Sequence, residues 1–448
     1  MSQPLPNHLL RLLLVEARWT GGELARAVNL AAAECGIRTT YDRTSVSHWL
    51  AGRRPRPPGP DLLAEVFSRR FGRTVSTADL GLDRPLPRQR GPATWVPEPV
   101  DTREELTLLR QLAPQPPHGR ALVGSVYSIA ALSVPGWPPP FTPPARPTGP
   151  YRPGIADIRA VEEMPALFSA VDARAGGGLA RRALASYLAH SVEPLLGSVL
   201  RPVQHQRLLV AASQLAYLCA FMCWDDLLHG AAQHYYRLAL SLAAEGGSST
   251  DYAIALRGMS VQALMLGHRR QAVHLSEGAV AAGTGVDPLR RAFLHGQLAV
   301  SRAVEQDRRR APQTLSAAER FLERAGSPAS APVGAYHLAA LRHQQAEMSA
   351  FLGDRRGAVA ALTDSVHLRP AEERRSLAVT LARLARLQAQ DGRLDEAVAT
   401  WHRFLDARTT LRSRRIDRAV TELRNQTRPY RRLPQVDALL QRTASPPR

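Results

Sequence analysis

The chain has 448 residues, of which 44% are hydrophobic and 22% charged, enough for about three domains with packed cores. Its 58 basic residues, all arginine, outnumber 39 acidic residues, and the net charge of +19 attracts phosphates and other anions. Three cysteines exclude a disulfide-rich secreted fold, and the longest apolar stretch, residues 121–134, is shorter than the roughly 20 residues of a membrane span. We therefore expect a cytoplasmic protein that does not enter a membrane.

Residues 1–80 have the pattern of a compact helical block. Thr20 and Glu23 have the spacing of a capping box, in which each side chain bonds to the backbone amide of the other residue. A helix is therefore predicted to begin here. Its residues expected to face the core are Leu24, Ala25, Val28 and Leu30.

A second, shorter helix is predicted to follow Asp42, because aspartate is a good N-cap. Gly52 favours its end, and Pro55 prevents it from continuing. The side chains expected on its buried face, at positions i, i+3 and i+4, are Val46, Trp49 and Leu50.

The other face of this helix carries short or basic hydrogen-bonding side chains: Arg43, Thr44, Ser47 and His48. A short helix with such an exposed face can enter the major groove of DNA and contact base edges. Three arginines directly after the helix are placed to meet phosphates: Arg53, Arg54 and Arg56. The alternative is an ordinary surface helix, with arginines that reflect a GC-rich genome. For His48 alone, a solvent-exposed histidine is an equal alternative.

Residues 47–55, with the sequence SHWLAGRRP, resemble the end of the recognition helix in XRE-type (λ-repressor-like) helix-turn-helix regulators. The resemblance implies that Asp42 caps the recognition helix and that the four exposed side chains face the bases. Two features depart from the family. Leu50 replaces the customary acid, and 22 residues separate Leu24 from Val46 where the family has about half that number. We expect this insertion to lengthen the preceding helix and the turn after it.

Residues 81–153 form a proline-rich linker in this interpretation, because they contain 17 of the 35 prolines. Proline fixes φ and lacks an amide proton, so the segment is not one continuous helix. One apolar piece, residues 121–134, is expected to dock against a neighbouring part of the chain. Its composition also suits a strand.

Residues 154–440 contain an internal helical repeat, in which a helix ends at a hinge and an alanine follows five positions later. The hinge and alanine pairs are Asp226 and Ala231, Gly267 and Ala272, Gln306 and Ala311, Gly353 and Ala358, and Gly392 and Ala397. The residues seven positions before each hinge are small: Cys219, Ser260, Ala299, Ala346 and Ala385. The residues nine positions after each hinge, usually large, are Tyr235, Ser276, Leu315, Leu362 and Trp401.

Small residues at these positions let the two helices of a hairpin approach closely, and neither helix buries its apolar face alone. The hairpins must therefore stack into a solenoid. The pattern resembles the tetratricopeptide repeat (TPR), above all around Gly353 and Gly392. The hinge spacings of 41, 39, 47 and 39 residues exceed the family norm of about 34, and a generic α-solenoid is the alternative.

A second resemblance covers most of residues 8–405. The blocks YSIAALSVPGW (127–137), GGG (176–178) and HGAAQHYY (229–236) are similar to a family of actinobacterial regulators. Proteins of that family join an N-terminal helix-turn-helix to a TPR-like region, and many act in development or secondary metabolism. The resemblance implies a class of regulator and no particular target gene.

No pattern in the sequence supports catalysis, a metal site or a cofactor site. Cys219 and Cys223 are four residues apart among apolar neighbours, so core packing explains them better than a metal pair. Asp225 and Asp226 are expected to cap the following helix. The glycines at 176–178 are expected to form a flexible turn, with an anion site at a helix N-terminus as the alternative.

These features predict an all-α protein with a helix-turn-helix domain (1–80), a linker (81–153) and a TPR-like domain (154–440). The predicted function is sequence-specific binding of double-stranded DNA by a transcriptional regulator that is not an enzyme. The repeat domain is expected to form a homodimer and to hold a peptide or protein ligand in its groove. The alternative is a protein-interaction scaffold whose N-terminal block no longer binds DNA.

Overall fold

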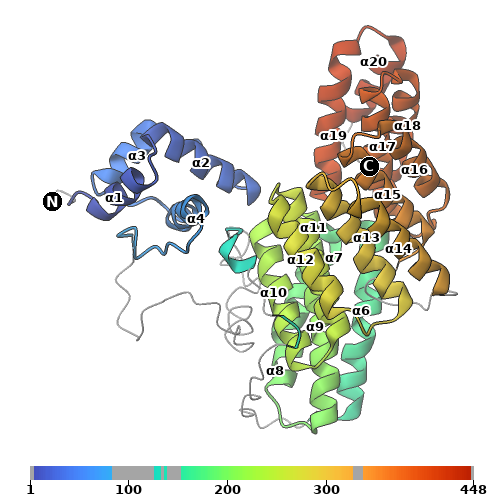
Figure 1. The fold of residues 1–448 in the computed structure, drawn as a ribbon, viewed down its shortest axis with the longest axis horizontal. Helices are drawn as coiled ribbons and strands as arrows, with labels where there is room; N and C mark the ends of the chain where they lie inside the picture. The colour runs from blue at the N-terminus through green and yellow to red at the C-terminus, as the bar shows by residue number, and fades with distance from the viewer. Residues whose placement is uncertain (1–4, 83–125, 133–135, 139–152, 326–335, 445–448) are drawn as a thin grey trace.

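A computed structural model of the chain describes residues 5–82, 126–132, 136–138, 153–325 and 336–444. All regular structure in these residues is helical, and they contain no strand, which confirms the predicted all-α class. Four helices form an N-terminal cluster beside a larger stack of helical hairpins (Figure 1). The N-terminal helices are α1 (His8–Glu16), α2 (Gly21–Glu34), α3 (Arg43–Leu50) and α4 (Gly59–Phe71).

The capping box predicted at the start of α2 is confirmed. The Thr20 hydroxyl accepts the Glu23 amide at 3.3 Å, and the Glu23 carboxylate accepts the Thr20 amide at 2.7 Å. Leu24, Ala25 and Val28 lie in the core as expected, but Leu30 is 65% exposed, so its predicted burial was wrong. A residue two positions along a helix from Val28 points to the opposite side, and the core stripe of α2 continues through the alanines at 31 and 32 instead.

The α3 helix also begins as predicted. The Asp42 carboxylate accepts the Ser45 amide at 2.8 Å, and the Ser45 hydroxyl completes a capping box by accepting the Asp42 amide. Val46 and Trp49 are buried, while Leu50 is only half-buried. Gly52, just after the helix, has φ +93°, a conformation that glycine adopts without strain.

The C-terminal region is a stack of antiparallel hairpins, shown from green to red in Figure 1. The helices of the first four hairpins are α9 (Pro202–Asp225) with α10 (His229–Glu245), α11 (Ser249–Met265) with α12 (Arg269–Ala282), α13 (Pro288–Val304) with α14 (Arg310–Arg324), and α15 (Leu338–Phe351) with α16 (Arg355–His367). The last two pairs are α17 (Arg374–Gln390) with α18 (Leu394–Ala407), and α19 (Arg414–Thr427) with α20 (Pro434–Ala444). Short 3-10 turns are η3 (Arg408–Thr410) and η4 (Arg428–Tyr430).

The hinges predicted from the repeat lie between the two helices of five hairpins. Four of them have a positive φ at the predicted residue: Gly267, Gln306, Gly353 and Gly392. In the first hairpin the positive φ falls on Leu227, one residue after the predicted Asp226. All fifteen small, alanine and groove-filling positions of the repeat are buried, from 0% to 9% exposed. The prediction of a helical-repeat region is therefore confirmed.

Before the first hairpin the chain forms α6 (Ile155–Ala175), α7 (Gly177–Tyr187), a π-helical turn η2 (Leu188–Val192) and α8 (Glu193–Leu196). The glycines between α6 and α7 lie against the backbone of Arg412, whose carbonyl accepts the Gly178 amide at 2.9 Å. A Cβ atom at Gly176 or Gly178 would lie less than 3 Å from that carbonyl oxygen. These glycines therefore allow two backbones to meet, and the predicted flexible turn was wrong.

The two ends of the helical stack are joined by buried ion pairs. Arg375 of α17 lies 3.0 Å from the carboxylate of Asp172 on α6, and its guanidinium stacks on Phe221 of α9. Arg415 of α19 lies 3.7 Å from Asp225 of α9 and stacks on Trp224. The last repeats therefore fold back onto the first.

Asp225 and Asp226 do not cap α10, contrary to the prediction. Asp225 accepts the Gly177 amide at 3.1 Å as well as facing Arg415, and Asp226 pairs with Arg181 of α7 at 2.9 Å. The N-cap of α10 is Leu228, which has no side-chain acceptor. Both carboxylates instead tie α9 to helices that are distant in the sequence.

One described helix, α9, is long and apolar enough to cross a membrane by length and composition alone. Most of this helix (83% of its most apolar window) is buried against other helices of the protein. A buried core helix of a helical-repeat protein can have the same length and apolar composition as a membrane-spanning helix.

We predict that replacing Arg375 with leucine destabilises the fold by roughly 3–5 kcal/mol, because it leaves Asp172 buried without its partner. Burial raises the pKa of Asp172 to about 6, against the opposing effect of Arg375. Because this pKa lies above that of an unfolded aspartate, ionisation of Asp172 costs stability as the pH rises, and without Arg375 it costs more. The loss of stability measured by urea unfolding should therefore be larger at pH 8 than at pH 5.

The double variant Asp172→Leu/Arg375→Leu is the control, since replacing both charges should recover much of the lost stability. Equal losses for Arg375→Leu at the two pH values would contradict the assignment of this pair.

Candidate nucleic-acid interface

The candidate interface is the outward side of α3 and the segment after it. All seven side chains singled out from the sequence are exposed: Arg43, Thr44, Ser47, His48, Arg53, Arg54 and Arg56. The opposite face of α3 is fixed in the core by Val46 and Trp49, which are 1% and 5% exposed. The structure thus places all seven on the solvent side of one short element.

Two neighbouring helices hold the ends of α3. The N-terminal turn of α2 lies against its first turn, where a Cβ atom at Gly21 would meet the Val46 side chain at 3.5 Å. The amide of Asn7, just before α1, donates to the carbonyl of Leu50 at 2.9 Å. These contacts fix the orientation of α3 in the N-terminal cluster.

The long connection between α2 and α3 is fastened by one amide side chain. The Asn29 Oδ1 atom accepts the Tyr41 amide at 2.9 Å and the Thr39 hydroxyl at 2.8 Å, and its Nδ2 atom donates to the Tyr41 carbonyl at 2.8 Å. The connection, residues 35–42, therefore has a defined shape. Asn29 was not predicted from the sequence, because its partners are ten and twelve residues away and no motif marks them.

Aromatic packing continues this support up to the arginine-rich segment. The Tyr41 ring meets the Trp49 ring edge to face, with centroids 4.9 Å apart. Pro55 is buried, and a Cβ atom at Gly59 would lie 2.8 Å from the Pro55 Cβ. The backbone that carries Arg53 and Arg56 is thus packed against the core, while their side chains extend into solvent.

The electrostatic character of this surface is basic. No acidic residue occurs between Asp42 and Asp61, a stretch that contains four arginines. Hydrogen bonds from the Ser45 amide and hydroxyl lower the pKa of Asp42, so its carboxylate stays charged and occupied as a helix cap. The Ser47 hydroxyl donates to the Arg43 carbonyl at 3.1 Å, which leaves its oxygen lone pairs as acceptors. The surface can therefore hydrogen-bond bases and attract phosphates.

The N-terminal cluster is attached to the repeat region through residues 126–132, which include the 3-10 turn η1 (Ala130–Leu132). Arg69 of α4 holds this segment by donating to the Tyr127 carbonyl at 3.1 Å. The same guanidinium lies 2.7 Å from Glu65 and 2.8 Å from Glu34. Glu65 in turn accepts the Ile129 amide at 2.9 Å.

The other side of this segment contacts the repeat region. Gln233 of α10 accepts the Ser128 amide at 2.8 Å and donates to the Ser128 carbonyl at 2.7 Å. The fully buried Tyr127 ring stacks on His268 with centroids 5.6 Å apart, and the Tyr127 amide donates to the Cys35 sulfur at 3.2 Å. Residues 126–132 therefore form hydrogen bonds with both the N-terminal cluster and the repeat region. Their regular structure is the 3-10 turn η1 and not a strand.

Several titratable side chains lie inside the helical core. Within the described residues, no group of three or more histidine, cysteine or acidic side chains is arranged to hold a metal ion. Cys219 and Cys223 are buried as free thiols in the helical core. Burial lowers the pKa of His229 to about 4, so this histidine is neutral inside the fold.

A known family model matches the N-terminal part of the chain. The model of the SP15 N-terminal domain matches residues 10–83, which contain nearly all of the four N-terminal helices and the turn after them. The matched part is about one sixth of the chain, and its description names no ligand or activity. The SP15 family is not a helix-turn-helix family, so the resemblance of residues 47–55 to XRE-type regulators stays a prediction. None of the curated proteins compared matches the chain.

We predict that Asn29→Ala frees residues 35–42 and destabilises the N-terminal cluster by about 2 kcal/mol, because two backbone groups of Tyr41 lose their partner. Hydrogen exchange of the Tyr41 amide should become faster, because in the wild type this amide donates a hydrogen bond to Asn29. Thr39→Val is the matched control, since it removes one of the three hydrogen bonds and should change exchange much less. Unchanged exchange at Tyr41 in Asn29→Ala would contradict this role.

Proposed function

We propose that the protein binds double-stranded DNA through α3 and the arginines after it, and that it acts as a transcriptional regulator. The observation that carries this proposal is the division of α3 into two faces. Val46 and Trp49 anchor one face in the core, while Arg43, Ser47 and His48 are exposed on the other. A rigidly mounted helix with an exposed polar face is what readout of the major groove requires.

In this proposal the two groups of side chains have different roles. The exposed residues of α3 would contact base edges and so choose the sequence, while Arg53, Arg54 and Arg56 would bind phosphates and set the position on the duplex. One eight-residue helix reads only a few base pairs. Two copies of the chain on a two-fold symmetric site would double the length of the site and raise specificity.

The role of the repeat region as a sensor of a peptide or protein is the finer part of the proposal. Arg375 and Arg415 reach from the last repeats to Phe221 and Trp224 on the first. A ligand lying along the first helices of all the hairpins would have to displace these stacked, ion-paired side chains. We therefore expect a ligand of this kind to open the stack.

A protein-interaction scaffold is the second candidate. The observation in its favour is the eight-residue connection between α2 and α3, which departs from the short turn of the helix-turn-helix families. In that case the N-terminal cluster would bind a protein or dock only against the repeat region. Binding experiments with DNA distinguish the two candidates.

We predict that Ser47→Ala/His48→Ala abolishes selection of one DNA sequence and leaves general affinity for DNA nearly unchanged. Both side chains are exposed, so the fold should persist. The measurement is sequencing of genomic fragments retained by the full chain at about 0.15 M salt. The wild type should enrich one palindromic motif, and removing each base contact should cost about 1–3 kcal/mol of discrimination.

The matched control is His367→Ala/Thr410→Ala, which removes an exposed histidine and an exposed hydroxyl in the repeat region. This variant should enrich the same motif as the wild type. If Ser47→Ala/His48→Ala also enriches it, α3 is not the recognition helix. Retention of random fragments by every protein, abolished by added salt, would favour the scaffold.

Neutralising Arg53, Arg54 or Arg56 with glutamine should have a different effect. Each substitution should weaken binding to all sequences, and the slope of log affinity against log salt should fall by about one for each phosphate that is no longer neutralised. Arg403→Gln, at an exposed arginine of α18, is the control of equal charge change and should leave the slope unchanged. An unchanged slope in the three variants would show that these arginines do not meet phosphates.

A further inference from the structure

None of the residues that the structure describes covers a stripe of apolar side chains on the outward face of α1. Leu9, Leu12 and Val15 are 48%, 65% and 71% exposed. They follow one another at intervals of three residues, while Leu10 and Leu13 point the other way into the core. A helix of a soluble domain normally exposes polar side chains on its outer face, so this stripe is a candidate contact surface.

This face is complementary to a second copy of itself. If two α1 helices pack antiparallel with Leu12 facing Leu12, position n of one helix lies opposite position 24 − n of the other. Leu9 then meets Val15, and His8 meets Glu16 at both ends of the contact. His8 and Glu16 are exposed and lie on the same face as the apolar stripe. The apolar centre and the polar ends thus match under one two-fold operation.

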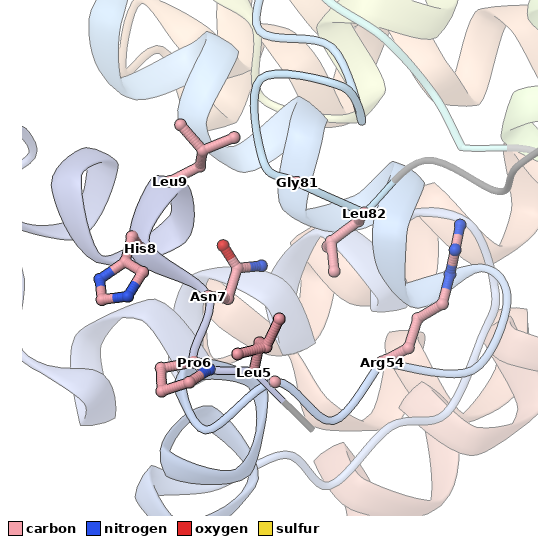
Figure 2. A pocket seen from close by; sticks show the side chains of 9 residues that line it. Leu5, Pro6, Asn7, His8, Leu9, Arg54, Gly81 and Leu82 are labelled. Atoms are coloured by element: carbon pink, nitrogen blue, oxygen red, sulfur yellow. The ribbon is translucent and has the colours of Figure 1, made fainter. Parts of the chain in front are cut away.

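A pocket of about 450 Å³ continues this face at its N-terminal end. It shares Leu9 with the stripe and adds Leu5 and Leu82 as apolar lining, with Arg54 at its edge. Figure 2 shows Leu5, Asn7 and Leu82 in the middle of the pocket, between His8 and Arg54. The Leu5 side chain is 87% exposed. The pocket therefore enlarges the apolar surface available to a second molecule.

We infer that two copies of this chain associate through the outward face of α1, packed antiparallel about a two-fold axis at Leu12. The inference assigns an interface to the dimer of the proposed function, but its test needs no DNA. The contact lies in the same cluster as α3, since the amide of Asn7 bonds to the Leu50 carbonyl at the end of α3. Association here would therefore fix two α3 helices relative to each other directly, without the repeat region as an intermediary.

The size of the surface sets the expected strength. A stable interface buries about 800 Å² on each partner, and a nine-residue helix with an adjoining pocket covers only part of that area. We therefore expect a weak dimer, with a dissociation constant of about 10 μM, that forms as concentration rises. Two half-sites on one DNA would favour it further by effective concentration.

The test is sedimentation equilibrium of the full chain from about 1 to 100 μM. The wild type should rise from 48.9 kDa toward twice that mass. Leu12→Glu places two carboxylates at the two-fold axis and should raise the dissociation constant at least about 100-fold. Leu30→Glu, at a leucine of α2 with the same 65% exposure, is the matched control and should behave as the wild type.

The two-fold register is tested by mixing opposite charges. Leu12→Glu and Leu12→Arg should each be monomeric alone and should form a dimer when mixed, because a carboxylate then faces a guanidinium. Circular dichroism of each variant checks that the helices are intact. A dimer of Leu12→Glu as strong as the wild type would place the contact elsewhere.

Other outcomes overturn the inference or separate it from the proposed function. A wild type that stays monomeric throughout this concentration range overturns the inference. If dimerisation fails in Leu12→Glu while no DNA motif is found for any protein, the inference stands and the proposed function fails. If a strictly monomeric protein enriches a DNA motif, the proposed function stands and the inference fails.

Discussion

A buried guanidinium needs an opposite charge beside it, and this requirement determines how the distant parts of the chain meet. Arg69 bonds two carboxylates and a backbone carbonyl, and so joins α2, α4 and the segment at Tyr127. Arg375 and Arg415 join the last repeats to the first differently, since each lies beside one carboxylate and stacks on one aromatic ring. The planar group presents five donors in a fixed fork, whereas a lysine offers a single charged centre. In a chain without lysine, arginine thus provides both the basic charge and the long-range connections.

Local signals in the sequence predicted the elements well, because the forces that start and stop a helix act within a few residues. The caps at Thr20 and Asp42 and the hinge at Gly353 are examples, since each depends on one side chain or one glycine beside the helix. The small residues of the repeat could be predicted for the same reason, because their spacing repeats along the chain. The two faces of α3 follow from the same helical periodicity.

Contacts between distant segments could not be predicted in this way. The roles of Asp225 and Asp226 depend on Arg415 and Arg181, and neither partner is near them in the sequence. Asn29 is a similar case, since it matters only once the chain has folded back over α2. Leu30 is a different case, because it lies two positions from the buried Val28 and helical periodicity already places it on the opposite side of α2. Helical periodicity and capping signals act within a few residues, so they do not predict such long-range contacts.

The separation of the α3 surface from the contact with the repeat region matters for the proposed regulator. The candidate surface on α3 and the contact with the repeat region are on different parts of the N-terminal cluster, so both can be occupied together. The segment at Tyr127 bonds to α4 on one side and to Gln233 on the other. A change in the repeat region at α10 would therefore reach the N-terminal cluster through a few hydrogen bonds rather than through a long tether.

The position of Cys35 has a practical consequence. Its thiol is 2% exposed beneath the Tyr127 backbone, and burial raises its pKa to about 11, so it is unreactive while the two bodies are together. The thiol also packs in the hydrophobic core of the repeat region, so it becomes accessible when the N-terminal cluster separates from residues 126–132 and from that core. Cys219 and Cys223 lie inside the helical core. The rate at which a thiol reagent labels Cys35 therefore measures how often the N-terminal cluster separates from the repeat region.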